Sequence, residues 1–197
     1  KANRSVSGMS AREHGLPIIG STFSGILNTV PRQYYPSSQR VYWIDGNVAQ
    51  RFNIPNDTVN AVPRWNTTTE TNNDRSGVSS LYYGYVKLGS GSKIERLDYA
   101  NDTPTSVHLN LTNAGSLMGG TTNTDYGYIA GGGTNPSMVQ RIDYSSDTTA
   151  ASVRGNLADN FNYWCKGVGY ANFGYFIGGQ PGISTVNRVD YSNDSAT

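Results

Sequence analysis

The chain of 197 residues carries a formal net charge of +1, and only 15% of its residues are charged. One cysteine and two histidines are too few for an internal disulfide, a cysteine zinc cluster or a three-histidine metal site. No run of 18 apolar residues occurs, which excludes a membrane-spanning helix of ordinary length.

The first 40 residues differ in charge from the rest of the chain. They contain five basic residues and one acidic residue, whereas the remainder is mildly acidic. A basic arm on an acidic body can dock against another subunit or an acidic surface, and the alternative is a solvated leader. We assign residues 1–35 to an N-terminal arm or docking segment and residues 36–197 to a repetitive body.

Four short aromatic segments mark the body, and each is followed by a glycine turn. They are VYWI at 41–44, YYGYVKL at 82–88, YGYIA at 126–130 and FGYFI at 173–177. Tyr, Val, Ile and Phe favour strands, and glycines such as Gly132 and Gly179 supply the positive φ that a tight turn needs. The sequence therefore predicts four strands that end in turns.

After each glycine turn a second strand runs into a recurring phrase: RFNIPNDT, RLDYANDT, RIDYSSDT or RVDYSNDS. The arginines of these phrases, spaced by 45, 45 and 47 residues, are Arg51, Arg96, Arg141 and Arg188. The aspartates that close the phrases keep the same intervals; they are Asp57, Asp102, Asp147 and Asp194. A fixed period of this size predicts that one small sheet is copied along the chain.

Two further strands complete each predicted unit. A glycine-containing strand precedes the aromatic one, as in GVSSLYYGY (77–85), and a less regular strand follows the phrase, as at 106–111. Four short antiparallel strands in about 45 residues have the size of a β-propeller blade, where glycine lets neighbouring inner strands approach. We predict an all-β propeller with about four visible blades, whose repeats end near residues 58, 103, 148 and 195.

The fourth unit stops where the third continues into a further strand. Two explanations are open: the repeat continues beyond Thr197, or an N-terminal strand completes the last blade. Residues 16–23 are the candidate for such a strand. An interruption in the middle of a unit favours the first explanation, a truncated propeller.

The aspartates within the phrases have a structural explanation. Asp98, Asp143 and Asp190 each follow an arginine by two residues and share its strand face, which predicts an arginine–aspartate pair inside each blade. The tyrosines that follow these aspartates are expected to pack between sheets. Calcium binding through the carboxylates is the alternative, but a feature repeated in every unit usually serves the unit itself.

The combination Tyr-(Ile/Phe)-x-Gly-Gly, followed some ten residues later by Arg-x-Asp-Tyr, resembles the kelch repeat with its diglycine after the second strand. The sequence FGYFIGG…STVNRVDYSNDSAT is most similar to kelch-like repeats of structural and tail-fibre proteins of marine phages, and the resemblance covers about residues 41–197. The usual kelch tryptophan near the fourth strand is missing from the second and third units, and Trp65 is its candidate in the first.

Catalytic and cofactor sites find little support in the residues. Copper-radical oxidases use a kelch propeller, but they need histidine ligands that this chain does not supply in sufficient number. Cys165 is expected to be a small apolar residue of a first strand. The glycine runs precede strands instead of helices, and no Gly-Lys-Ser/Thr occurs, so they do not form a phosphate loop. We expect no catalytic residue, metal or cofactor.

Aromatic rings beside Asn and Asp side chains are typical of sugar-binding surfaces, and blade-to-blade packing is the alternative for each ring. The candidates for glycan or receptor contact are Tyr34, Tyr35, Tyr163, Trp164 and Tyr170. We expect a non-enzymatic component of a phage tail or fibre that serves assembly or host-surface adhesion. Its expected partners are other virion proteins, further copies of itself or a host surface glycan, with no nucleic acid and no membrane span. The alternative is a secreted or cell-surface lectin; an enzyme on the same scaffold ranks third.

Overall fold

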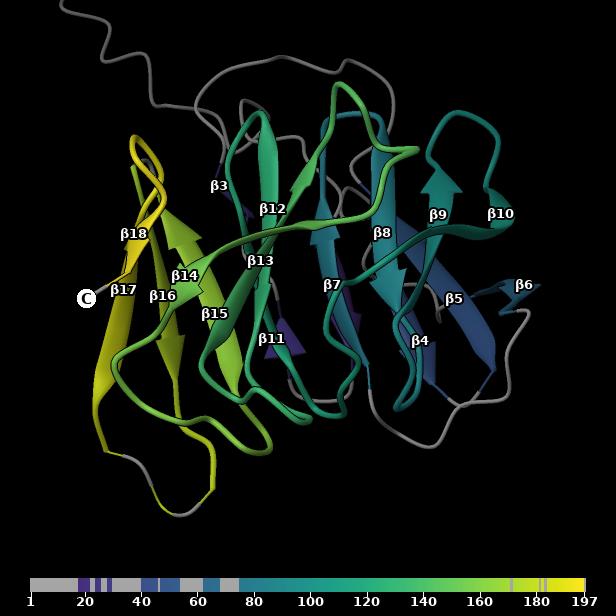
Figure 1. Ribbon diagram of the computed structural model, residues 1–197. Helices are drawn as coiled ribbons and strands as arrows, with labels where there is room; N and C mark the ends of the chain where they lie inside the picture. Colours follow the sequence, from purple (N-terminus) through teal and green to yellow (C-terminus); the bar gives the residue numbers. More distant parts are fainter. Residues whose placement is uncertain are drawn as a thin grey trace, which may run out of the picture.

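The computed structural model describes residues 18–21, 24–25, 28–29, 40–45, 47–53, 62–67, 75–170, 172–180, 182 and 184–196. All regular structure in these ranges is β-strand, arranged in four sheets that follow one another along the chain (Figure 1). The prediction of an all-β fold with one sheet per repeat is therefore confirmed.

The second and third sheets each consist of the four antiparallel strands of one repeat, in chain order. The second sheet contains β7 (Ser76–Ser79), β8 (Tyr83–Lys87), β9 (Lys93–Asp98) and β10 (Thr103–Asn110). The third contains β11 (Gly119–Thr122), β12 (Tyr126–Ala130), β13 (Met138–Asp143) and β14 (Ser152–Asn156). These bounds follow the predicted pattern of aromatic strand, glycine turn and arginine-containing strand.

The first and fourth sheets each gain strands from the N-terminal region. The first has the order β2 (Ser24–Gly25), β1 (Ile18–Ser21), β4 (Arg40–Asp45), β5 (Val48–Asn53) and β6 (Val62–Asn66). The fourth has the order β18 (Ser195–Ala196), β17 (Val186–Asp190), β16 (Phe173–Ile177), β15 (Lys166–Tyr170) and β3 (Asn28–Thr29). β1 is parallel to β4, and β3 is parallel to β15.

The expected role of residues 16–23 is corrected by this topology. β1 lies in that range, but it pairs with β4 of the first sheet and does not complete the last blade. The fourth sheet instead receives β3 beside its innermost strand. Part of the range assigned to the N-terminal arm thus belongs to the sheets. These strands are short and pair in parallel, so the sequence contains no alternating pattern that would have predicted their partners.

Close contacts between the inner strands join successive sheets. β1 contacts β7, β7 contacts β11, and β11 contacts β15. Gly120 of β11 faces Gly77 of β7 so closely that a Cβ on Gly120 would lie 2.5 Å from the Gly77 carbonyl oxygen. A Cβ on Gly167 of β15 would collide in the same way with the carbonyl of Gly120. Glycine therefore allows the backbones of neighbouring inner strands to approach.

The hydrophobic core lies between the sheets, in three clusters. One joins the first and second sheets through residues such as Ile44 and Leu97, and another joins the second and third through Ile94 and Ile129. A third cluster, which includes Phe176, joins the third and fourth sheets. Within the described ranges, no helix is long and apolar enough to cross a membrane.

Candidate functional site and the contacts between sheets

A stacked pair of tyrosines joins each sheet to the next. The tyrosine that ends an Arg-x-Asp-Tyr phrase lies flat against a tyrosine in the aromatic strand of the preceding sheet. The pairs are Tyr42–Tyr99, Tyr85–Tyr144 and Tyr128–Tyr191, with ring centroids 5.5, 5.1 and 5.0 Å apart and interplanar angles of 14°, 14° and 22°. Aromatic pairs at such distances stabilise packing beyond their buried area. The expectation that these tyrosines pack between sheets agrees with this geometry.

The aspartate that closes each phrase extends this contact with a charged group. Asp147 of the third unit accepts hydrogen bonds from the Tyr85 hydroxyl at 2.6 Å and the Arg96 guanidinium at 2.9 Å, both in the second sheet. Asp194 accepts from Tyr128 at 2.7 Å and from Arg141 at 2.6 Å. The third and fourth units therefore each bind the preceding unit through a carboxylate inserted between a tyrosine and an arginine.

The same arrangement occurs between the first two sheets. Asp102 accepts a hydrogen bond from the Tyr42 hydroxyl at 2.5 Å and another from the Arg51 guanidinium. Asp102 and Asp194 adopt positive φ values of 59° and 60°, which aspartate tolerates better than most residues. We call the set of closing aspartate, tyrosine and arginine the inter-sheet clamp.

Among the described residues no salt bridge joins the arginine and the aspartate predicted to pair inside a blade, although the charge of Arg141, after hydrogen bonds from Ser145, also lowers the pKa of Asp143. The aspartates two residues after the arginines accept hydrogen bonds from nearby backbone amides instead: Asp98 from Ala100 at 2.8 Å, Asp143 from Ser145 at 2.9 Å and Asp190 from Ser192 at 2.9 Å. Such Asx turns hold the chain reversal at the end of the strand. Strand alternation puts each of these aspartates on the same face as its arginine. Arg51, Arg96 and Arg141 nevertheless form their ion pairs with the closing aspartate of the next unit.

A basic side chain from the outer strand adds a further contact to each clamp. The nearest nitrogens of Arg64, His108 and Arg154 lie 3.9, 3.0 and 3.6 Å from Asp102, Asp147 and Asp194, respectively. The three residues occupy the same position in the segments VPRWN, SVHLN and SVRGN. His108 is thus the counterpart of two arginines, which favours a structural role in the clamp.

Two of the clamp arginines, Arg96 and Arg141, are held over aromatic rings of their own sheet. The guanidinium carbons of Arg96 and Arg141 lie 4.3 Å and 3.9 Å from the ring centroids of Tyr83 and Tyr126. Arg188 of the fourth sheet has the same arrangement, 4.5 Å from the ring centroid of Phe173. Cation–π contact therefore helps to orient Arg96 and Arg141 toward the aspartate of the next unit.

The clamp shifts the ionisation of its members. Burial raises the pKa of Asp147, but hydrogen bonds from Tyr85, His108 and Arg96 together outweigh this effect and lower the pKa below the ordinary aspartate value. Burial, reinforced by the Asp147 carboxylate, raises the pKa of Tyr85, and burial with Asp194 does the same for Tyr128. These hydroxyls remain protonated donors, as the clamp requires.

A second recurring contact was missed in the sequence, at the residue just before Arg141 and Arg188. Gln140 accepts a hydrogen bond from the Asn113 amide at 2.7 Å and donates one to its carbonyl at 3.2 Å. Asn187 donates to the Asp159 carboxylate at 2.7 Å and accepts from its backbone amide at 3.1 Å. Asn113 lies in the linker that leads into the third sheet, and Asp159 lies in the linker that leads into the fourth. A polar residue at a buried strand position was the available signal.

Cys165 and the turn glycines singled out in the sequence have structural roles. Burial raises the pKa of the Cys165 thiol to about 12, so the thiolate is scarce at neutral pH. Gly132 (φ +64°) lies against the Ser116 carbonyl, and Gly179 (φ +107°) lies beside Phe161, so both are turn glycines as expected. In the described part of the chain, no three His, Cys, Asp or Glu side chains are grouped to hold a metal ion.

Of the residues predicted to contact a glycan or receptor, the three that the structure describes lie at two separate places. Tyr163 and Trp164 are 46% and 51% exposed, with ring centroids 6.2 Å apart, in the segment that leads into β15. Tyr170 is 68% exposed but ends β15, so it lies at the opposite end of that strand. Tyr34 and Tyr35 lie outside the described residues.

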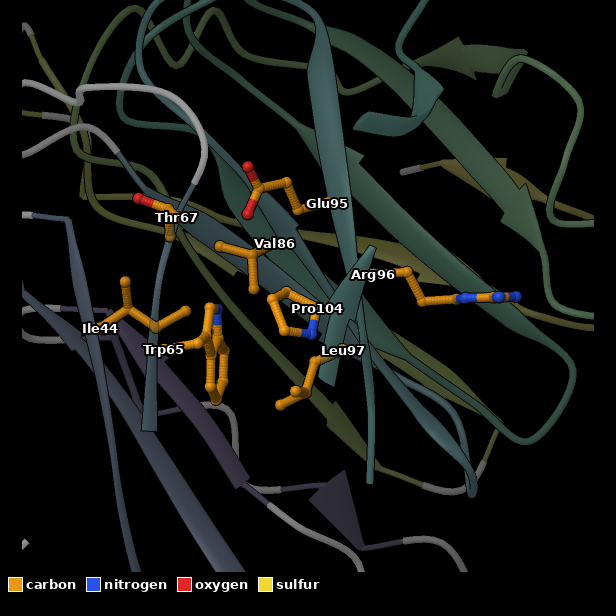
Figure 2. Close-up of a pocket in the computed structure, with 8 residues that line it drawn as sticks. All are labelled: Ile44, Trp65, Thr67, Val86, Glu95, Arg96, Leu97 and Pro104. Carbon is orange, nitrogen blue, oxygen red and sulfur yellow. The ribbon is translucent and has the colours of Figure 1, made fainter. Parts of the chain in front are cut away.

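A small crevice lies between the first and second sheets. Its lining residues are Ile44, Trp65, Thr67, Val86, Glu95, Arg96, Leu97 and Pro104. Figure 2 shows the side chains of Trp65, Leu97 and Pro104 turned toward one another, while Arg96 points away from them. The Trp65 ring centroid lies 5.7 Å from that of Tyr42. Trp65 therefore fills the space between two sheets as a packing residue.

Comparison with known proteins identifies the fold alone. No family model matches the sequence, and no curated protein matches it. Solved structures with a similar fold include one described as "Structure of YjhT", with a TM-score of 0.65 and 11% sequence identity. The similarity covers 85% of this chain and 66% of that chain. At this identity the likeness concerns the arrangement of the strands and does not extend to activity.

Proposed function

We propose that this chain is a non-enzymatic structural module, a kelch-like β-propeller segment of a phage virion that serves in the tail or fibre. The observation that carries the proposal is the inter-sheet clamp. The recurring tyrosines, arginines and closing aspartates, which are the chemically active residues of the repeat, bind one unit to the next at three successive interfaces. Because these side chains are occupied in contacts between units, they favour a role in assembly or adhesion over a role in catalysis.

Arrangement of the sheets around a common axis is part of this proposal. The inner strands contact one another in succession, from β1 through β7 and β11 to β15. β1 and β3 join the inner edges of the first and fourth sheets, although only six residues separate Ser21 from Asn28. An extended segment of that length spans at most about 25 Å. This limit supports a curved arrangement in which the inner edges of the first and last sheets approach each other.

The virion assignment is tested by mass spectrometry of purified phage particles from a host that carries the corresponding gene. We expect peptides of this chain to remain with particles through density-gradient purification and to be enriched in tail fractions. A cytoplasmic host protein of similar abundance serves as the control for contamination. Recovery of the chain only in the particle-free fraction would contradict a virion role.

The second candidate function is that of a secreted or cell-surface carbohydrate-binding module. It is favoured by Tyr163 and Trp164, which place two half-exposed rings together in the segment before β15. Trp164 also adopts a φ of +56°. A left-handed conformation at a bulky residue costs free energy and often marks a functional position.

A glycan array tests this alternative directly. Binding that is lost in the Tyr163→Ala/Trp164→Ala variant and kept in Tyr170→Ala would support a lectin site at that segment. Affinity in the micromolar range, about −8 kcal/mol, would be typical of such a binder. Equal binding by the wild type and both variants would show that the rings of Tyr163 and Trp164 do not bind the glycan.

A further inference from the structure

Two uncharged segments of the fourth unit lie side by side. Residues 160–165, with the sequence NFNYWC, lead into β15, and residues 178–184, with the sequence GGQPGIS, connect β16 to β17. The Tyr163 carbonyl accepts a hydrogen bond from the Gln180 backbone amide at 3.0 Å, and the Gln180 carbonyl accepts one from the Asn162 backbone amide at 3.3 Å. The two segments therefore form one surface whose backbone is held in place.

The rings of Tyr163 and Trp164 are exposed by a backbone bend that recurs in the repeat. Trp164 and Leu117 each lie two residues before the innermost strand of their sheet, and both have a φ of 56°. Ser116 and Leu117 stay partly exposed although the fourth unit follows theirs. The bend thus turns this position toward solvent even in a unit that has a successor. The side chains that it presents differ between the two units, and only the fourth presents two aromatic rings.

Side-chain amides flank the two rings. They belong to Asn160, Asn162 and Gln180, and no residue in the described part of the chain forms a hydrogen bond with any of these amide groups. Asp159, the nearest carboxylate in the sequence, is already bonded to the Asn187 side chain at 2.7 Å. An aromatic ring offers a flat apolar surface to the C–H face of a pyranose, and an amide can both donate to and accept from hydroxyl groups.

We propose that Tyr163 and Trp164 form a binding site for a neutral hexose unit of a surface glycan, whose hydroxyl groups bond to the side-chain amides of Asn162 and Gln180. A neutral sugar fits better than an acidic one because residues 160–165 and 178–184 contain no charged side chain to pair with a carboxylate or a sulfate. The fixed backbone reduces the ordering that binding requires. The inference rests on the carbohydrate-binding candidate described above and names its ligand class.

The ligand class is tested on an array that holds neutral glycans of glucose, galactose and mannose beside sialylated, sulfated and uronic-acid glycans. We expect binding to the neutral set alone. Isothermal titration with the strongest neutral binder should give a dissociation constant that changes less than about twofold between about 50 and 500 mM NaCl, because salt screens only charged contacts.

Trp164→Gly separates binding from folding. Glycine adopts the positive φ at this bend without strain, so the melting temperature should stay the same or rise, while loss of the ring should raise the dissociation constant by about tenfold or more. Leu117→Gly, the same kind of change at the counterpart bend, is the matched control and should leave glycan binding unchanged. Asn162→Ala should weaken binding by about three- to tenfold because one hydrogen-bonding group is lost.

Three outcomes would contradict the inference in different ways. Binding to acidic glycans that weakens with salt and is lost in Trp164→Gly would overturn the neutral ligand class and leave carbohydrate binding at this site standing. Glycan binding that Trp164→Gly leaves intact would overturn the site. Failure of the wild type to bind any glycan would overturn both this inference and the carbohydrate-binding candidate, whereas the virion assignment is decided separately by particle composition.

Discussion

Each closing aspartate concentrates several contacts at one residue. Asp147 binds Tyr85 and Arg96 of the preceding sheet, and the His108 ring nitrogen lies 3.0 Å away. Hydrogen bonds to a charged group contribute more to stability than neutral ones, and loss of one partner leaves a partly buried charge less well satisfied. The strength of the contact between units therefore depends on single side chains that recur with the repeat.

Replacement of His108 by arginine distinguishes a structural from a catalytic role. The first and third units use arginine at this position, so we expect His108→Arg to keep the free energy of unfolding within about 0.5 kcal/mol of the wild type or to raise it. His108→Ala should lower it by about 1 kcal/mol because Asp147 loses a partner. Urea denaturation measures both changes. Equal losses for the two variants would show that the clamp does not accept arginine there.

The lowered pKa of Asp147 predicts an acid-sensitive stability. Folding favours the ionised carboxylate, so its contribution is present above the unfolded value of about 4 and is lost as the pH falls below it. We expect Asp147→Asn to destabilise the protein at pH 7 and to reduce the dependence of stability on pH between about 5 and 2. Chemical denaturation at several pH values gives both quantities. Identical pH profiles would contradict this origin of acid sensitivity.

At the scale of elements, the inner strands set how closely two sheets can approach. Gly77, Gly120 and Gly167 face one another across successive sheets, and a side chain on the middle glycine would meet the carbonyl of the first. Separation of the inner strands would also separate the stacked tyrosines and the clamps, because these lie on the same sheets. The glycine of the inner strand and the aspartate of the closing turn therefore serve one interface.

Gly120→Ala tests this requirement. The added Cβ would lie 2.5 Å from a backbone carbonyl oxygen that cannot rotate away, and we expect a loss of about 2–3 kcal/mol in the free energy of unfolding. Gly91→Ala is the matched control: its nearest neighbour would be 4.0 Å away, and the loss should stay below about 0.5 kcal/mol. Thermal or urea unfolding of the two variants provides the comparison. A tolerated Gly120→Ala would mean that the sheets can separate freely.

For the whole molecule, local patterns were sufficient to place most strands. The aromatic segment at 126–130 and its glycine turn correspond to β12 and the turn after it, because alternation and turn residues act over a few positions. The partner of Arg96 is determined by how one unit docks on another, which strand alternation does not contain. The only sequence signal for that docking was that the arginines and the closing aspartates recur at the same intervals. No sequence signal predicted the parallel pairing of β1 with β4.

A double-mutant cycle on Arg96 and Asp147 measures the contact between units most directly. The variants Arg96→Gln and Asp147→Asn, alone and combined, should give a coupling free energy of about 1–2 kcal/mol, because the two side chains are largely buried and hydrogen-bonded. The parallel cycle on Arg96 and Asp98, within one sheet, should give a value within about 0.3 kcal/mol of zero. A large coupling to Asp98 together with none to Asp147 would contradict the inter-sheet clamp.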